Sequence, residues 1–252
     1  MRRLAAYRPA GRPARVRRGS AAVVVACALA FAAASAGASA YPPDPSANIA
    51  FGPLPGACES SPRGAACEHG AIRALDAARA KLGLGRYLLP ADFVSLVPAR
   101  QWLILSNLDR IAYRLRPVHG LAPALDKVAK QGALAHADPD PGPLLQSLPN
   151  QQTLGFASNW AGGQQNALIA YFGWMYDDGP GGPNIDCRTA GEAGCWGHRH
   201  DILAFGQGGS LTMGAAAVPG ASYALTIVDT ARPPWPYAYT WAQAKRDGAG
   251  SG

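Results

Sequence analysis

Apolar residues recur every three or four positions in four segments of the chain, which is the spacing of a helix with a buried face. The segments are residues 70–82, 98–115, 121–137 and 164–176. The second segment has the clearest pattern, and Pro98 suits the first turn of a helix, where no backbone N–H is needed. We therefore predict four helices before residue 177.

Two short apolar runs follow, at residues 211–218 and 222–228. They are joined by Pro219-Gly220-Ala221, and Pro and Gly are typical of a turn between two strands. The pattern predicts a β-hairpin. A helix-rich beginning followed by strands indicates an α+β sandwich.

The segments on either side lack this periodicity. Residues 41–69 are rich in Pro, Gly and Ala and are predicted to form an extended leader, whereas residues 70–231 form the domain. Residues 232–252 begin Arg-Pro-Pro-Trp-Pro-Tyr and end Gly-Ala-Gly-Ser-Gly. We predict a tail there, which is either loose or laid on the domain by its aromatic side chains.

Residues 1–40 have the three parts of an export signal. Seven arginines and no acid lie before residue 19, an apolar run covers residues 21–34, and Ala38-Ser39-Ala40 follows. This order is typical of a signal peptide that is removed on export. The apolar run is too short for a membrane helix, which needs roughly 18 apolar residues. We expect a secreted or cell-envelope protein that meets the membrane only through the uncleaved signal.

Removal of the signal changes the charge of the protein. The chain has 23 Lys and Arg against 16 Asp and Glu, and seven of the basic residues leave with the signal, so 16 basic and 16 acidic residues remain. A nucleic-acid-binding surface needs clustered basic residues that neutralise phosphates. The sequence after residue 40 has no such cluster, so we exclude nucleic acid as a partner.

Four cysteines follow the signal: Cys58, Cys67, Cys187 and Cys195. An even number of cysteines in an exported protein predicts two disulfides, for which three connectivities exist. The spacing favours Cys58–Cys67 and Cys187–Cys195, because each pair brackets a turn that contains Gly. A zinc site is the alternative, but neither pair has C-x-x-C spacing.

An ordered series of motifs runs from about residue 71 to residue 230. It consists of Asn107-Leu-Asp-Arg110, Ser158-Asn-Trp-Ala-Gly-Gly163, a helix that carries Trp174, and Trp196-Gly-His198-Arg199-x-Asp201-Ile-Leu203. The series resembles the CAP superfamily of cysteine-rich secretory, antigen 5 and pathogenesis-related proteins, which includes exported bacterial domains. The last motif is similar to the family's Gly-His-Arg-x-Asn-Ile-Leu signature. The resemblance implies a three-layer α-β-α sandwich.

The resemblance also implies a cleft, which family members often build from two His and two Glu and which can hold a divalent metal. His198 matches the second His, Asp177 stands where the family often has Glu, and Ser158 stands at the other Glu position. The first His is expected near residues 144–145, where this chain has Leu. His198 and Asp177 are half a metal site, to which His200 adds an imidazole only if the segment is a strand. We therefore expect no cofactor, and the candidate ligands for a divalent metal are His198, Asp177 and His200.

The expected ligand cleft consists of Asn159, Trp174, Trp196, His198 and Arg199. The two tryptophans are also typical of core or cleft-wall positions, because large aromatic side chains dominate burial. Arg199 is expected to bond backbone carbonyls or to pair with Asp177 or Asp178. Asp201 is expected to cap a turn or the start of a helix. The acidic stretch at 177–186 lacks the spacing of a calcium loop and favours turn formation.

Two functions fit these residues. The first is a non-catalytic binding module whose cleft takes a lipid, a glycan or a cell-wall component. The second is a hydrolase that uses His198 with Asp177 or Ser158 for acid–base or nucleophilic chemistry. The missing His and Glu partners favour the binding module, and the balanced charge favours a monomer.

Overall fold

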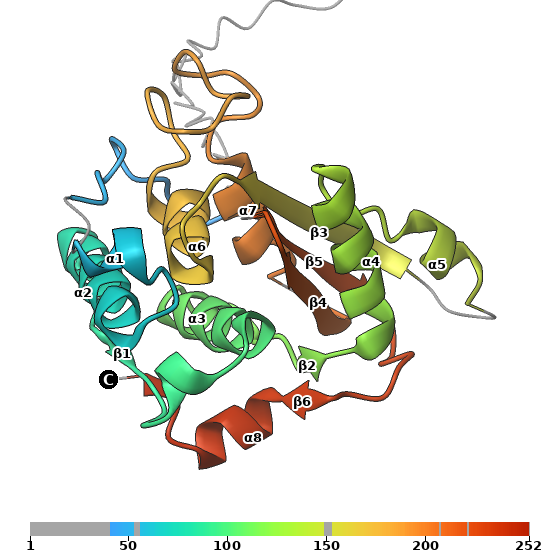
Figure 1. The fold of residues 1–252 in the computed structure, drawn as a ribbon. Coiled ribbons are helices and arrows are strands. Elements are labelled where there is room, and N and C mark those ends of the chain that lie inside the picture. The colour runs from blue at the N-terminus through green and yellow to red at the C-terminus, as the bar shows by residue number, and fades with distance from the viewer. Residues whose placement is uncertain (1–40, 53–55, 149–152, 207, 221, 252) are drawn as a thin grey trace, which may run out of the picture. The chain divides into compact units, whose positions relative to one another are not determined.

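The structure is a computed structural model that describes residues 41–52, 56–148, 153–206, 208–220 and 222–251 (Figure 1). The predicted export signal, residues 1–40, lies outside the described residues. The helices are α1 (Ala57–Ser60), α2 (Ala65–Lys81), the 3₁₀ turn η1 (Phe93–Ser95), α3 (Pro98–Ala112), α4 (Pro123–Ala135), α5 (Gly142–Gln146), α6 (Ala167–Tyr176), α7 (Gly197–Leu203) and α8 (Trp241–Arg246). The strands are β1 (Tyr87–Leu88), β2 (Gly120–Leu121), β3 (Thr153–Gly162), β4 (Ser210–Val218), β5 (Ser222–Thr230), β6 (Tyr239–Thr240) and β7 (Gly250–Ser251).

The four predicted helices are confirmed as α2, α3, α4 and α6. The third begins later than predicted, because Pro123 occupies its first turn and leaves the two preceding residues outside the helix. Those two residues, Gly120 and Leu121, pair with β4 and β6 as the short strand β2. The fourth helix begins at Ala167, and the side chain of Asn166 caps it by accepting a hydrogen bond from the Ile169 backbone N–H at 2.9 Å.

Among the described residues, the main sheet has five strands in the order β3-β5-β4-β2-β6. β4 and β5 form the predicted hairpin, with Ser210 opposite Thr230 and Val218 opposite Ser222. β2 runs parallel to β4, and the other pairs are antiparallel. Helices together with this mixed sheet confirm the α+β prediction. A separate pair, β1 with β7, is antiparallel.

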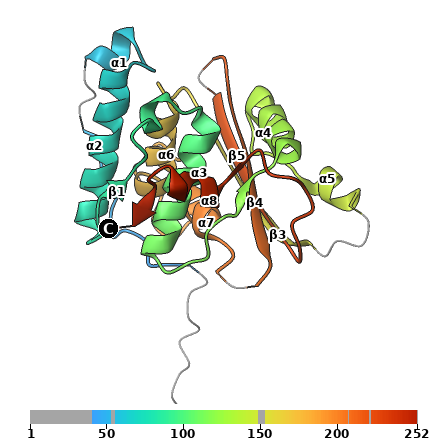
Figure 2. The same cartoon turned by 90° about the horizontal axis from the view of Figure 1, so that it is seen from below.

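Alternate residues of the hairpin face opposite sides of the sheet, as the two-residue repeat of a strand requires. Met213 and Leu225 enter the large core that also contains residues of α2, α3 and α6. On the other side, Val228 packs with Leu125 of α4, and a Cβ on Gly214 would collide with the backbone of Leu125. Helices therefore cover both faces, with α4 and α5 on one and α3, α6 and α7 on the other (Figure 2).

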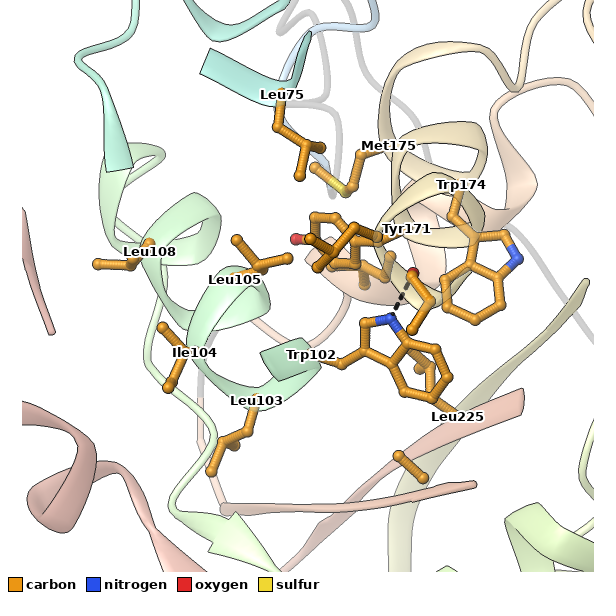
Figure 3. Packing of buried hydrophobic residues seen from close by; sticks show 14 of the residues in the cluster. Leu75, Trp102, Leu103, Ile104, Leu105, Leu108, Tyr171, Trp174, Met175 and Leu225 are labelled. Atoms are coloured by element: carbon orange, nitrogen blue, oxygen red, sulfur yellow. Dashed lines mark hydrogen bonds between the residues drawn. The ribbon is translucent and has the colours of Figure 1, made fainter. Parts of the chain in front are cut away.

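α3 is the central helix of the large core, and its residues Gln101–Arg110 are all buried. Trp102 fills the space between α3 and α6 and donates a hydrogen bond from Nε1 to the Ala167 carbonyl at 2.9 Å (Figure 3). The ring of Trp174 lies beside it, with ring centroids 5.5 Å apart. Large aromatic side chains contribute most to such a core, so this contact anchors α6 on α3.

Two buried polar residues of α3 hold the chain segments around it. Asn107 exchanges hydrogen bonds with the backbone of Val118, at 2.6 Å to its N–H and 2.9 Å to its carbonyl. Arg110 donates to the carbonyls of Ile202 and Ala204 at 2.8 and 2.7 Å. A buried polar group is costly unless it is hydrogen-bonded, and these bonds meet that cost while fixing the C-terminal end of α7.

Asp109, a third buried residue of α3, gathers several partners at its carboxylate. The hydroxyls of Tyr87, Tyr171 and Tyr176 donate to it at 2.8, 2.6 and 3.0 Å. The guanidinium of Arg79 pairs with the same carboxylate. The charge of Asp109 is thus balanced inside the core, and the cluster links α2, β1, α3 and α6.

The predicted leader is corrected, because residues 41–52 and 56–69 belong to the fold. α1 and the first part of α2 lie within this range. The Ile49 backbone N–H donates to the Tyr176 carbonyl at 2.8 Å, and the Asn48 side chain accepts from the Gly179 backbone N–H at 2.7 Å. Apolar Phe51 also packs edge-on against Phe172. The domain boundary expected at residue 70 is therefore placed too late.

The predicted tail is corrected in the same way. β6 extends the main sheet, and β7 pairs with β1. α8 begins with a capping box, in which the side chains of Thr240 and Gln243 each bond the backbone of the other residue. Tyr239, Trp241 and Ala244 are buried. The sequence left open whether this segment is loose or laid on the domain. The burial of these side chains and the helix cap hold it on the domain.

Both predicted disulfides are present. Cys58–Cys67 joins α1 to α2 with a Cα–Cα distance of 4.8 Å, and Cys187–Cys195 closes part of the loop between α6 and α7 with a distance of 4.5 Å. These distances lie in the normal range for a disulfide. In the described part of the chain, no helix is both long enough and apolar enough to cross a membrane.

Candidate functional site

The acidic loop between α6 and α7 folds around the side chain of Asn184. Its Nδ2 donates to the carbonyls of Asp178 and Gly194 at 3.1 and 2.9 Å and to the carboxylate of Asp178 at 2.8 Å. Its Oδ1 accepts from the Asp186 backbone N–H at 2.9 Å. The last bond forms an Asx turn, so the turn chemistry predicted for residues 177–186 is confirmed. The Cys187–Cys195 disulfide closes the same loop.

Asp178 holds both His198 and the start of α7. Its Oδ2 accepts from the His198 backbone N–H at 2.9 Å, and its Oδ1 lies 2.6 Å from His198 Nδ1. A carboxylate at the N-terminal N–H groups of a helix is stabilised by hydrogen bonding and by the helix dipole. Since a carboxylate accepts, Nδ1 carries a proton, and the neutral ring leaves Nε2 as an acceptor.

The sequence predicts Asp177 as the carboxylate partner of His198, but the structure places Asp178 beside the imidazole. Asp177 is the C-cap of α6 and lines the cavity described below. Asp178, one residue further on, is 2% exposed and faces α7. The point at which α6 ends decides which of the two adjacent acids meets the imidazole.

His200 lies apart from His198. The segment is the helix α7 and not a strand, and residues two apart on a helix differ by about 200° in direction. His200 Nε2 lies 2.9 Å from Asp44 Oδ1, and its ring stacks on Tyr41 with centroids 4.4 Å apart. A strand at this segment would have brought both imidazoles to one metal, and the structure does not form that strand.

Asp201 lies inside α7 and does not cap it. The residue before the helix is Trp196, which has a left-handed φ of 59° and no side-chain capping bond. Asp178 caps this helix from the preceding loop. Asp201 instead follows His198 by three residues, and positions i and i+3 share a face of a helix.

A cavity of about 340 Å³ opens beside His198. Its walls come from the loop after α4, the end of β3, one side of α6 and the acidic loop. The lining residues with chemical character are Asp138, Trp160, Trp174, Asp177, Asp186 and His198. The volume is at the lower end of the range for small-molecule sites, which is about 300–1,000 Å³.

Of the five residues expected in the cleft, Trp174 and His198 line this cavity. Asn159, Trp196 and Arg199 are buried behind its walls. Asn159 Nδ2 donates to the His198 carbonyl at 2.8 Å and so ties β3 to α7. These three residues support the site and do not line it.

Arg199 is fully buried, at 0% exposed. It donates to the Met175 carbonyl at 3.0 Å and to the Tyr113 hydroxyl at 2.8 Å, which confirms the expected bond to a carbonyl. Its Nε lies 3.7 Å from Asp44 Oδ1. The side chain therefore pairs with an acid of the N-terminal segment, and not with Asp177 or Asp178.

Ser158 and His198 lie on opposite sides of the sheet. Ser158 is paired with Thr226 in the strand register and donates to its hydroxyl at 2.8 Å. Thr226 shares a face with Val228, which packs on α4. His198 belongs to α7, on the other face (Figure 2). The arrangement Ser158–His198–Asp177 is therefore not formed, and Ser158 is excluded as the partner of this histidine.

Asp177 and His198 line one cavity, but the structure adds no third metal ligand to them. Among the described residues, no group of three or more His, Cys, Asp or Glu side chains is arranged to hold a metal ion. His200, the third candidate, bonds Asp44 instead.

Two cavity residues, Asp138 and Trp160, were not expected as site residues. In the sequence, Asp138 is notable only for ending a helix, yet it accepts a hydrogen bond from the Trp160 backbone. Residues 144–145, where the family's first His is expected, lie in α5, and Leu145 packs with Leu125 in a small core. The sequence signal that could have identified Trp160 as a site residue was its place as a large aromatic side chain inside the motif at residues 158–163.

His198, Asp177 and the neighbouring Asp201 have raised pKa values. Burial raises the pKa of Asp201 to about 7; His198 opposes this effect, and the charges of Asp138 and Asp178 add to it. Burial also disfavours the charged form of His198, but the hydrogen bond and charge of Asp178, with the charges of Asp138 and Asp201, raise its pKa above the ordinary value. Burial and the charge of Asp178 raise the pKa of Asp177. The site can therefore exchange protons close to neutral pH.

Comparison of the chain with protein-family models, with curated proteins and with solved structures finds no match.

Proposed function

We propose that this chain is an exported CAP-type protein with a three-layer α-β-α sandwich, and that its His198 cavity binds a cell-wall glycan without catalysis. The ordered motifs at 107–110, 158–163 and 196–203 support the family. Helices on both faces of the sheet and two disulfides are compatible with it (Figure 2). The order of sequence patterns at 1–40 supports export.

The lining of the cavity carries the proposal of a glycan. Asp138, Asp177 and Asp186 supply carboxylate oxygens, which accept hydrogen bonds when ionised. Trp160 and Trp174 supply aromatic walls. Their indole N–H groups donate to Ser222 and to the Trp160 carbonyl, so the polar edge of each ring is already paired, and Trp160 is the more exposed of the two. A sugar matches this combination, because it offers hydroxyl donors together with apolar C–H faces.

A lipid tail fits the same cavity less well. It would remove water from carboxylates without offering them hydrogen-bond donors, and burying an unpaired charge is costly. The acidic lining therefore favours a polar ligand over an acyl chain, which narrows the ligand classes expected from the sequence.

The test is titration of the protein with soluble peptidoglycan fragments, followed by tryptophan fluorescence. Trp160 and Trp174 should report saturable binding. Asp186→Asn combined with Ile185→Ala should weaken binding at least fivefold, because both side chains line the cavity and are exposed, so the fold is unaffected. Glu59→Gln is the matched control, since Glu59 is an exposed acid of α1 outside the cavity. Equal binding by the double variant and the control would refute the proposal.

The His198–Asp178 pair supports hydrolysis as a second candidate function. A carboxylate that orients an imidazole at the wall of a cavity is an arrangement suited to general-base activation of water. The test is mass spectrometry of peptidoglycan fragments after incubation with the protein and with His198→Gln. Hydrolysis requires cleavage products that the variant fails to release. If the fragments stay intact with both proteins and still bind, the result supports the non-catalytic binding module.

A further inference from the structure

A second cavity of about 350 Å³ lies where α2 and α3 end, next to β7. Three arginines line it: Arg79, Arg86 and Arg114. Leu84, Leu108 and Ile111 form the apolar part of its surface, and the remaining lining residues are Gly and Ala. No Asp or Glu is among these described lining residues, so the cavity is positive.

Arg79 is rigidly held at the wall of this cavity. Its Nε donates to the Gly85 carbonyl at 2.6 Å, its Nη1 pairs with Asp109, and its guanidinium lies over the ring of Tyr87 at 4.3 Å from the centroid. A side-chain hydrogen bond with Tyr87 holds the guanidinium as well. Arg79 is 5% exposed and lines the cavity, so it forms a rigid part of the wall there.

Arg86 and Arg114 bring positive charge that the surrounding protein does not balance. Both are exposed, and within the described chain neither guanidinium forms an ion pair or a hydrogen bond. Arg79 is neutralised by Asp109, so the cavity carries two uncompensated charges. A dianion would neutralise both.

The backbone at Arg114 indicates that its side chain is needed. α2 and α3 end in the same motif, in which two backbone N–H groups bond back into the last helical turn. The left-handed position of this motif is Gly83 after α2, with φ 71°, and Arg114 after α3, with φ 60°. Glycine adopts this conformation without a steric penalty, whereas other residues do not. The two helix ends are equivalent and lie beside one cavity. Glycine occupies the left-handed position at one of them, and at the other the position is taken by arginine, which is strained there but adds a guanidinium to the cavity.

We propose that this cavity binds a phosphate group, either as inorganic phosphate or as a small phosphomonoester. A phosphate carries up to two negative charges near neutral pH and matches the fork of guanidinium donors. The leucine and isoleucine side chains give the organic part of an ester an apolar surface. The site is separate from the His198 cavity and does not depend on the function proposed there.

The test is calorimetric titration of the purified protein with inorganic phosphate at constant ionic strength. One saturable site is expected. Arg114→Gly should lower the affinity at least tenfold and yet raise the melting temperature by roughly 1–4 °C, because it relieves the left-handed conformation. Arg86→Gln should also lower the affinity. Arg73→Gln is the matched control, since Arg73 is an exposed residue of α2 outside the cavity.

The outcomes separate a built site from general charge attraction. Loss of affinity in Arg114→Gly and Arg86→Gln, with the control unchanged, supports the proposal. Absence of saturable binding, wild-type affinity in Arg114→Gly, or an equal loss in Arg73→Gln overturns it. Parallel titration with glycerol 3-phosphate identifies the source: tighter binding than phosphate supports an ester ligand, and weaker binding supports the free ion.

Discussion

At the residue scale, His198 and Asp201 both favour the protonated state in the folded protein. The pKa of Asp201 is about 7, against an ordinary value of 3.8, and the pKa of His198 lies above 6.5. A group whose pKa is higher in the folded state binds its proton more tightly there. The free energy of unfolding then falls as the pH rises from the unfolded to the folded pKa. For Asp201 this window runs from about pH 4 to about pH 7.

Replacement of Asp201 by Asn removes this titration. We expect Asp201→Asn to raise the melting temperature by a few degrees at pH 8, where the wild-type carboxylate is charged and partly buried. At pH 4 the two proteins should melt together, because the carboxyl is then protonated in the fold. Scanning calorimetry at both pH values checks this. An equal difference at both would contradict the pKa assignment.

Replacement of Asp178 by Asn should lower the pKa of His198, because the hydrogen bond and charge that raise it are weakened. Asp178→Asn should also cost about 1–3 kcal/mol of stability, since the charge-assisted bonds to the start of α7 are weakened. The imidazole proton shifts in NMR spectra at varied pH measure the pKa. Asp177→Asn is the control: Asp177 lines the cavity but forms no hydrogen bond with His198, so the histidine should titrate nearly as in the wild type.

At the element scale, the four long helices α2, α3, α4 and α6 were predictable, whereas the short helices and the short or edge strands were not. α3 and α4 have long apolar patterns, which run to Leu115 and to Ala137 in the sequence. β3 lies at the edge of the sheet with partly exposed faces, so its residues, including Gly155 and Asn159, lack apolar alternation. β2 and β6 are two residues each, too short for any period. Their existence depends on partners that lie far away in the sequence.

The same limit applies to the candidate site. His198 and Trp174 were found because each belongs to a motif that can be recognised locally. Asp138 was missed, since only the fold brings the loop after α4 to the end of β3. Asp177 was chosen over Asp178 because it stands where the resembled family often has Glu, and the sequence does not define where α6 ends to within one residue.

The contact between α4 and the sheet depends on the absence of a side chain at Gly214. We expect Gly214→Ala to cost about 1–3 kcal/mol, because the new methyl group overlaps Leu125 and the helix must move. Urea denaturation measures the loss. Gly56→Ala is the control, since its φ is −54° and no atom lies within 4 Å of the added Cβ. A comparable loss in the control would show that the contact with α4 is unimportant.

At the scale of the whole molecule, both ends of the described chain are fastened onto its middle. The N-terminal segment reaches α7 through Asp44, which bonds His200, and the C-terminal segment adds β6, α8 and β7. The single domain therefore extends beyond residues 70–231 in both directions. This arrangement escaped sequence analysis because Pro and Gly recur in both segments and interrupt any apolar periodicity.

Removal of residues 237–252 tests the importance of the C-terminal segment. It deletes Tyr239 and Trp241, whose burial contributes a few kcal/mol, and exposes the edge of β2. We expect the melting temperature to fall by about 10 °C or more. Thermal melting followed by circular dichroism measures this. Thr240→Ala keeps the segment and loses only the cap, for which about 1 kcal/mol is expected. A truncated protein as stable as Thr240→Ala would show the segment to be a loose tail.

The pairing of β1 with β7 has a consequence for the order in which the protein is completed. Tyr87 pairs with Ser251, and Gly120 of β2 pairs with Thr212 of β4. Such distant pairings form slowly and only after both segments have been synthesised. Nearly the whole chain must therefore leave the ribosome before its sheets can close. The two disulfides join cysteines nine and eight positions apart, so these links can be made locally while the strands still await their partners.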